Sequence, residues 1–150
     1  MPPDHLKAHY LRAKAAEYAW TFLSLPYIWD GDDPVRGFDC SGFVVEVLQA
    51  VGLLPHKSDF TANGLCLRFA KSRVDKSYAG CLVLWFDQAG LATHVEMMVD
   101  DYHTIGASGG GSSTTSPQAA VDQNAFVKMR PLGYRGSNYK IIDHFLRVTE

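Results

Sequence analysis

One cysteine has the surroundings of a nucleophile. Cys40 sits in the stretch GFDCSG, between a polar, glycine-containing loop and the apolar run FVVEVLQAVG, so it opens a predicted helix. The free N–H groups and the dipole of a helix start stabilise a thiolate, which is the form of cysteine that attacks carbonyl carbons. The same N–H groups can hold the oxyanion of a tetrahedral intermediate. The stretch therefore predicts nucleophilic catalysis by Cys40.

A nucleophilic thiol needs a base, normally a histidine that is oriented by a third polar group. Among the six histidines, His94 begins a predicted strand that can pack on the helix of Cys40. His103 would project from the opposite strand of the same hairpin. A rigid strand position suits a catalytic group better than a loop. The residues alone therefore favour His94 as the general base.

The elements that must position these residues follow from apolar spacing. Helices are predicted over residues 4–23, 40–51 and 61–71. Strands are predicted over residues 81–86, 93–99, 102–107 and 125–130. Residues 109–117 read as a flexible, glycine-rich loop, and residues 138–148 fit either a strand or a helix. Helices first and antiparallel strands later predict an α+β fold, with N-terminal helices packed on an antiparallel sheet, in a single domain over residues 1–150.

Composition narrows the classes of function. The 150 residues are 47% hydrophobic with a net charge of −2, so a globular core is expected and a nucleic-acid partner is not. No apolar run is long enough to span a bilayer, and the first twenty residues read as an amphipathic helix rather than a signal peptide. The three cysteines lack CxxC spacing, so we expect no metal site on them and no other cofactor. We expect all three to be free thiols in a protein that is synthesised in the cytoplasm.

These motifs resemble those of the NlpC/P60 family of papain-like cysteine peptidases. The family's PYxWGG loop, GFDCSG helix start, GDLVFF strand and HVGIY strand correspond here to residues 26–31, 37–42, 80–86 and 94–98. Their order and rough spacing agree over about residues 8–108. The resemblance implies a papain-like NlpC/P60 fold.

The resemblance also implies a reaction: cleavage of amide bonds in peptidoglycan stem peptides, typically between D-glutamate and the diamino acid. Cys40 then corresponds to the nucleophile and His94 to the general base. Tyr27 corresponds to a tyrosine that lines the site, and Asp39 and Ser41 to residues that help hold the substrate's amino group. An acidic residue there suits a stem peptide with a free, cationic N-terminus.

The chain departs from the family pattern at the third catalytic position. The family carries His, Asn or Gln on the strand after the base, where this chain has Gly106. The family glycine two residues after the base is Glu96 here, and strand alternation puts Glu96 on the same sheet face as His94. We expect Glu96, or a backbone carbonyl, to orient His94. A relocated His103 is the competing idea, but strand parity places it on the opposite face from position 106.

Two other functions remain open at this point. One is a non-catalytic protein that kept the fold and binds the cell wall or serves as a structural component, which Gly106 favours. The other is a papain-like acyltransferase or amidase acting on a different substrate. For the hydrolase, action on the cell wall after delivery is expected, either by a phage particle, as a tail-associated lysin with phage tail proteins as partners, or by a dedicated export machine.

Overall fold

The computed structural model describes residues 4–149, with side chains described for residues 7–146. Its α-helices are α1 (Asp4–Trp20), α2 (Cys40–Ala50), α3 (Ala62–Arg68) and α4 (Pro117–Gln123), and its 3₁₀ helices are η1 (Ala70–Ser72) and η2 (His144–Thr149). Its strands are β1 (Asp32–Asp33), β2 (Gly37–Phe38), β3 (Arg73–Val74), β4 (Leu82–Phe86), β5 (Ala92–Met98), β6 (His103–Ser108), β7 (Phe126–Pro131) and β8 (Tyr139–Ile142). Within this described part, no helix combines the length and the apolar character that a membrane crossing requires.

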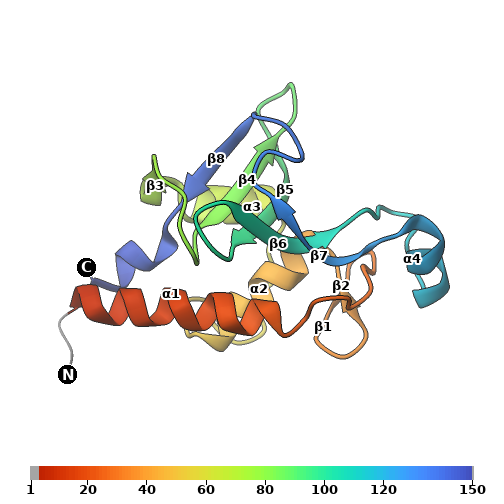
Figure 1. Ribbon diagram of the computed structural model, residues 1–150, viewed down its shortest axis with the longest axis horizontal. Coiled ribbons are helices and arrows are strands. Elements are labelled where there is room, and N and C mark those ends of the chain that lie inside the picture. The colour runs from red at the N-terminus through yellow and green to blue at the C-terminus, as the bar shows by residue number, and fades with distance from the viewer. Residues whose placement is uncertain (1–3, 150) are drawn as a thin grey trace.

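Six of the strands form one antiparallel sheet in the order β3-β8-β4-β5-β6-β7, and β1 and β2 form a separate small hairpin. Helix α1 runs along one side of the molecule, and α2 packs on both α1 and β5 (Figure 1). The predicted α+β fold, with helices on an antiparallel sheet, is confirmed.

Different elements pack on the two faces of the sheet. On one face, Leu84, Val95 and Ile105 join the main core with the helices. On the other face lies a smaller cluster made of Cys81, Val83, Trp85, Met98 and Ile141. Its outer cover comes from partly buried side chains that include Leu132, Tyr134 and Tyr139. The second face is therefore covered mainly by the chain around β8 rather than by helices.

The connection from β7 to β8 crosses the sheet. Strand β7 is at one edge, whereas β8 pairs with β4, so β6, β5 and β4 lie between the two consecutive strands. Four strand spacings amount to roughly 19 Å. Residues 132–138, named here the crossing loop, make this connection and contain turns, in which Tyr134 N donates to Pro131 O and Gly136 N donates to Gly133 O. This loop carries Tyr134 onto the second face of the sheet.

Three predicted segments need correction. Helix α1 ends at Trp20 rather than near residue 23, because Thr21 Oγ1 donates to Tyr18 O at 2.6 Å and Ser24 adopts a φ of 72°. The chain following the glycine-rich loop folds into α4, which the sequence reading missed. The ambiguous residues 138–148 divide into β8 and then η2.

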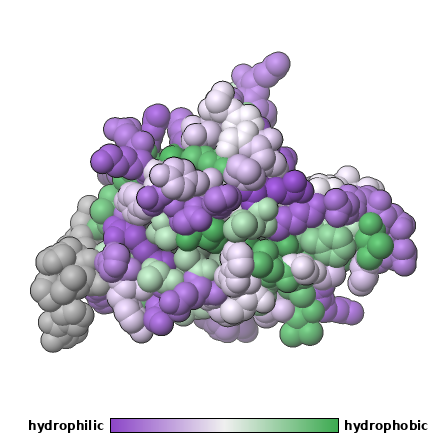
Figure 2. Space-filling model, in the orientation of Figure 1, coloured by the Kyte–Doolittle hydropathy of each residue, from purple (hydrophilic) through white to green (hydrophobic). Residues whose placement is uncertain are grey.

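Helix α4 has ordinary start and stop signals. Ser116 caps it by accepting a hydrogen bond from Ala119 N, Pro117 occupies its first turn, and Asn124 ends it in the left-handed region at a φ of 54°. The face of the molecule in Figure 2 mixes hydrophilic and hydrophobic residues, and hydrophilic residues lie both at its edge and across its centre. Val35, in the turn between β1 and β2, is 82% exposed.

Candidate active site

Cys40 is the first residue of α2, and the local geometry fixes this helix start. The side chain of Asp39 caps the helix by accepting hydrogen bonds from Gly42 N at 2.7 Å and Ser41 Oγ at 3.4 Å. A Cβ at Gly42 would lie 2.0 Å from the carbonyl oxygen of Gly31, so only glycine allows the loop to pack this closely on the helix. The thiol of Cys40 is free and half-buried. The predicted helix start is therefore confirmed.

His94 lies near the start of β5 and connects two acidic partners. Its Nε2 is 2.6 Å from Glu96 Oε2, and the thiol of Cys40 lies close enough to its ring to raise its pKa. Because Nε2 faces Glu96, Nδ1 is the nitrogen left for Cys40. Burial lowers the pKa of His94, but the hydrogen bonds and negative charges of Cys40 and Glu96 outweigh burial and raise it. The geometry therefore favours the protonated form of His94, placed between Cys40 and the carboxylate of Glu96.

The carboxylate of Glu96 is fully buried and accepts three hydrogen bonds. Oε2 faces His94 Nε2 and also accepts from the hydroxyl of Tyr134 at 2.5 Å. Oε1 accepts from Thr104 Oγ1 at 2.7 Å. A buried carboxylate is costly unless donors satisfy it, and here the donors also fix its orientation. Both oxygens of Glu96 are thus held in place, with Oε2 directed at His94.

Gly106 leaves the space that the side chain of Glu96 fills. Met97 pairs with Ile105, and the same antiparallel register places Glu96 opposite Gly106. A Cβ at Gly106 would lie 2.3 Å from Glu96 Cγ and 2.8 Å from its Cδ, which no real structure tolerates without rearrangement. The side chain of Glu96, on the neighbouring strand, therefore occupies the space that a side chain at position 106 would fill.

The three predicted substrate residues lie around Cys40. The ring of Tyr27 is buried against Gly110, where a Cβ would lie 2.3 Å from Tyr27 Cδ1. Burial, together with the nearby Cys40 and Asp39, raises the pKa of Tyr27. Burial also raises the pKa of Asp39, although the bonds from Gly42 and Ser41 oppose this effect. All three residues are close enough to line one site, and their contact with a substrate stays a prediction.

Two other residues with reactive side chains, His103 and Cys81, lie away from Cys40 and His94. His103 is at the β5–β6 turn, where its Nδ1 is 3.0 Å from Asp100 Oδ2, and its side chain is 39% exposed. Cys81 is fully buried in the second cluster, and burial raises the pKa of its thiol to about 11. Neither residue contacts His94. Asp30, which stands where the family has glycine, keeps a φ of 58°, a conformation that aspartate tolerates better than most residues.

Sequence reasoning missed three residues that surround the base. Thr104 shares a strand face with Gly106 by alternation, so the sequence held the signal for it. The ring of Trp85 lies 5.6 Å from the ring of His94, measured between centroids. Tyr134 comes from the crossing loop, and no local pattern indicates that it reaches Glu96.

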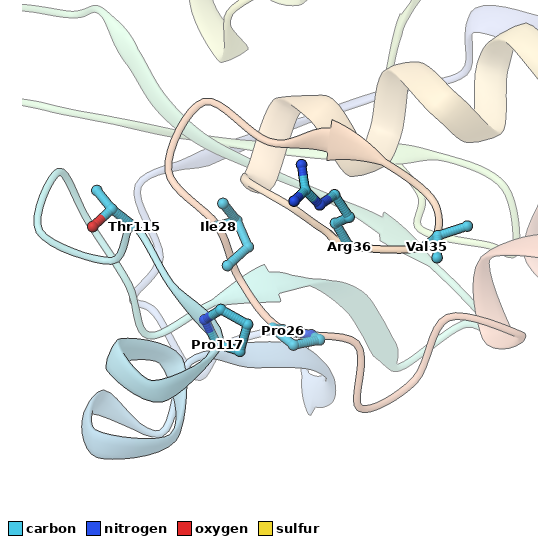
Figure 3. A pocket seen from close by; sticks show the side chains of 6 residues that line it. All are labelled: Pro26, Ile28, Val35, Arg36, Thr115 and Pro117. Atoms are coloured by element: carbon cyan, nitrogen blue, oxygen red, sulfur yellow. The ribbon is translucent and has the colours of Figure 1, made fainter.

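A cavity of about 490 Å³ opens beside the site, between the β1–β2 hairpin and the start of α4 (Figure 3). Its lining residues are Pro26, Ile28, Val35, Arg36, Thr115 and Pro117. Tyr27 lies between Pro26 and Ile28, and alternation along this extended segment turns its ring away from the cavity. The segment thus separates the cavity from Cys40.

Known proteins are similar to this chain in sequence and in fold. The profile of the NlpC/P60 family matches residues 24–131. Protein P54 of Enterococcus faecium is 33% identical over 107 residues, which are 67% of this chain and 17% of that protein. A protein of Mycobacterium tuberculosis named "Probable endopeptidase" is 43% identical over 54 residues, which are 35% of this chain and 14% of that protein. The chain therefore spans a small part of the curated relatives it matches.

Solved structures agree on the fold. An NlpC/P60 family protein from Bacillus cereus has a TM-score of 0.66 at 24% identity, covering 87% of this chain and 39% of that one. The NlpC/p60 domain of the peptidoglycan hydrolase SagA has a TM-score of 0.61 at 23% identity, covering 87% and 97%. The peptidoglycan hydrolase RipB from Mycobacterium tuberculosis has a TM-score of 0.63 at 18% identity, covering 95% and 67%.

Proposed function

Because the chain belongs to the NlpC/P60 family, we propose that it is a cysteine endopeptidase that hydrolyses amide bonds in peptidoglycan stem peptides. The bond proposed is the one between D-glutamate and the diamino acid. The observation that carries the proposal is the position of His94, which lies between the thiol of Cys40 and the carboxylate of Glu96, with Nε2 2.6 Å from Glu96 Oε2. This is the arrangement of nucleophile, base and orienting group that covalent catalysis requires.

In the first step the thiolate of Cys40 adds to the carbonyl carbon of the scissile amide. The free N–H groups of the first turn of α2 stabilise the oxyanion that forms. When the intermediate collapses, the C–N bond breaks and the imidazolium of His94 gives its proton to the leaving nitrogen. The products of this step are a free amine and a thioester on Cys40.

In the second step water hydrolyses the thioester. His94, now neutral, accepts a proton from the attacking water, and the second tetrahedral intermediate expels the thiolate of Cys40. The carboxylic product leaves, and the thiolate–imidazolium pair is restored. No electron transfer is involved, so the two steps need only water and side chains of this protein besides the substrate.

Glu96 is proposed as the group that orients His94, in place of the family residue at position 106. Its Oε2 is 2.6 Å from Nε2, which fixes the ring and stabilises its positive charge. The carboxylate should make the imidazolium more persistent than a neutral amide would, because opposite charges raise a histidine pKa. Gly106 is consistent with this role, since a larger residue there would displace Glu96.

Tyr27, Asp39 and Ser41 are proposed to hold the substrate. The carboxylate of Asp39 is only partly used in capping and stays partly exposed, so it can also attract the free amine of a stem peptide. Ser41 Oγ lies beside it and adds a polar contact. Tyr27 supplies a rigid wall next to the thiol. These contacts would place the scissile carbonyl over Cys40.

The non-catalytic alternative loses its main support. Gly106 favoured it, because the family's third polar residue was absent, but Glu96 occupies the same space with a polar group. The acyl-transfer alternative uses the same first step and differs only in the acceptor of the acyl group. The delivery route to the cell wall stays a prediction.

The direct test is mass spectrometry of purified peptidoglycan after digestion with the wild-type protein and with Cys40→Ala. New free amino groups on the diamino acid, formed only by the wild type, are expected. Identical fragment profiles for the two proteins would overturn the peptidase proposal. Adding an amine acceptor to the reaction separates hydrolysis from acyl transfer, since a transferase would yield amide adducts.

A further inference from the structure

The crossing loop brings Tyr134 into contact with Glu96, the carboxylate that faces the proposed base His94. The hydroxyl of Tyr134 donates to Glu96 Oε2 at 2.5 Å, the same oxygen that faces His94 Nε2. Tyr134 is 38 residues from Glu96 in the sequence and belongs to none of the family motifs. This contact exists because the loop between β7 and β8 crosses the face of the sheet on which Glu96 lies.

The ring of Tyr134 is held on two sides. It lies edge-on to Trp85, with centroids 6.0 Å apart, and the guanidinium carbon of Arg130 lies 5.5 Å from its centroid. Trp85 in turn contacts the ring of His94. Burial and the charge of Glu96 raise the pKa of Tyr134 to about 12, so its hydroxyl stays protonated and can act only as a donor to this carboxylate at neutral pH.

Glu96 faces away from the helical core, on the side of the sheet that the chain around β8 covers. Its carboxylate is nevertheless completely buried. Without a cover, water would solvate Oε2 and compete with His94 for its lone pairs. Tyr134 supplies both the cover and a fixed donor in place of water.

We propose that Tyr134 is a positioning residue for His94, acting through Glu96. It shares Oε2 with the imidazole, and so it sets both the orientation of the carboxylate and the amount of negative charge that His94 experiences. This proposal rests on the proposed function only for its effect on turnover. Its effect on the titration of His94 holds whether or not the protein is a peptidase.

The sign of the effect follows from charge sharing. A donor to Oε2 partly neutralises the carboxylate, so removing that donor leaves more negative charge facing the imidazolium. Tyr134→Phe should therefore raise the pKa of His94 above its wild-type value. It should also loosen the carboxylate and lower kcat about ten-fold, the usual effect of losing one hydrogen bond to a charged group, with KM unchanged.

The test is an NMR titration of ¹⁵N-labelled histidine in the full chain, combined with steady-state kinetics on a soluble stem peptide. Tyr139→Phe is the matched control, because Tyr139 also lies 6.0 Å from Trp85 and makes no hydrogen bond with Glu96. Tyr134→Phe should move the His94 titration upward and reduce kcat, and Tyr139→Phe should do neither. A second variant, with 3-fluorotyrosine at position 134, keeps the ring and strengthens the donor, so it should move the titration downward.

Each outcome decides the proposal. An unchanged His94 titration in both Tyr134 variants would overturn it, and so would equal effects from Tyr134→Phe and Tyr139→Phe, because ring packing alone would then suffice. If the wild type cleaves no stem peptide, the proposed function fails, whereas opposite titration shifts in the two Tyr134 variants would still support the positioning role.

Discussion

Glu96 and Gly106 are complementary across two neighbouring strands: the carboxylate-bearing side chain of one occupies the space that a Cβ on the other would need. The pair explains how a chain without the family's third polar residue can still fix its base. It also makes the two positions interdependent, so that their substitutions should not be additive.

The first prediction concerns exchange of the two positions. Gly106→Asn should inactivate the protein, because its Cβ would lie 2.3 Å from Glu96 Cγ. Glu96→Gly should lower kcat about 100-fold, because His94 loses its orienting partner. The double variant restores the family pattern, and we expect kcat/KM within about ten-fold of the wild type. A double variant no more active than Glu96→Gly would contradict the exchange.

The second prediction concerns the pH profile. Glu96→Gln removes the charge that helps to raise the pKa of His94 but keeps the size of the side chain. The imidazolium should then lose its proton at lower pH, so the alkaline limb of kcat/KM should move down. Glu46→Gln is the control, because its carboxylate also accepts from a tyrosine, Tyr18, but lies outside the site. Superimposable profiles for wild type and Glu96→Gln would remove Glu96 from the mechanism.

The third prediction concerns thiol reactivity. At pH 6 Cys40 should react with iodoacetamide faster than free cysteine does, because it begins α2 and lies beside His94, whose pKa is raised. His94→Ala should slow the reaction to the rate of free cysteine. Cys81 should stay unlabelled in the folded protein, since it is buried and its pKa is raised to about 11. Peptide mapping after labelling identifies the modified residue, and labelling of Cys81 before Cys40 would be the contrary result.

The fourth prediction concerns stability. Arg12 of α1 donates to the fully buried Asp143 at 2.5 Å, and the hydroxyl of Tyr78 donates to the same oxygen. Arg12→Met would leave a buried carboxylate without its cation and should lower the free energy of unfolding by about 3 kcal/mol. Lys14→Met, which breaks the exposed pair with Glu17 on the same helix, should leave the free energy of unfolding unchanged. Urea unfolding measures the difference, and equal effects of the two variants would be unexpected.

The fifth prediction concerns acid. His144 is fully buried, and neither of its ring nitrogens has a hydrogen-bond partner among the described residues. Burial lowers its pKa from the ordinary 6.5 to about 3. Below pH 6.5 His144 therefore becomes protonated in the unfolded chain but stays neutral in the folded chain. This lowers stability by up to about 1.4 kcal/mol per pH unit as pH falls from 6.5 toward 3.

His144→Leu should flatten this part of the stability profile. The same substitution at exposed His9 is the control. Denaturant unfolding at pH 7, 6, 5 and 4 gives the slopes directly. A slope for His144→Leu that matches the wild type would show that other groups dominate the acid response.

The site was predictable where its signals are local. Cys40 follows a capping Asp39 at a helix start, and His94 and Glu96 share a strand face, so short stretches of sequence indicate all three. Helix α4 also has local signals, Ser116 and Asn124, but its seven residues follow a glycine- and serine-rich stretch that reads as continuous loop. Its omission was an error of interpretation.

Tyr134 could not be predicted in this way. Its contact with Glu96 depends on β8 pairing with β4 rather than with β7, which follows from the topology of the whole sheet. The number of donors that Glu96 accepts from could not be predicted from the sequence for the same reason. Periodicity indicates which residues share a face, but it does not indicate which distant loop will cover that face.

The topology of the crossing loop also has a consequence for the order of folding. Tyr134 lies between β7, which pairs with β6, and β8, which pairs with β4 from a distant part of the chain. Such long-range contacts form late, because their loop-closure entropy is large. We therefore expect the contact between Tyr134 and Glu96 to form later in folding than the local contact between His94 and Glu96. A ribosome-bound chain in which β8 has not yet been made would carry Cys40 and His94 in a sheet without the strand that pairs with β4.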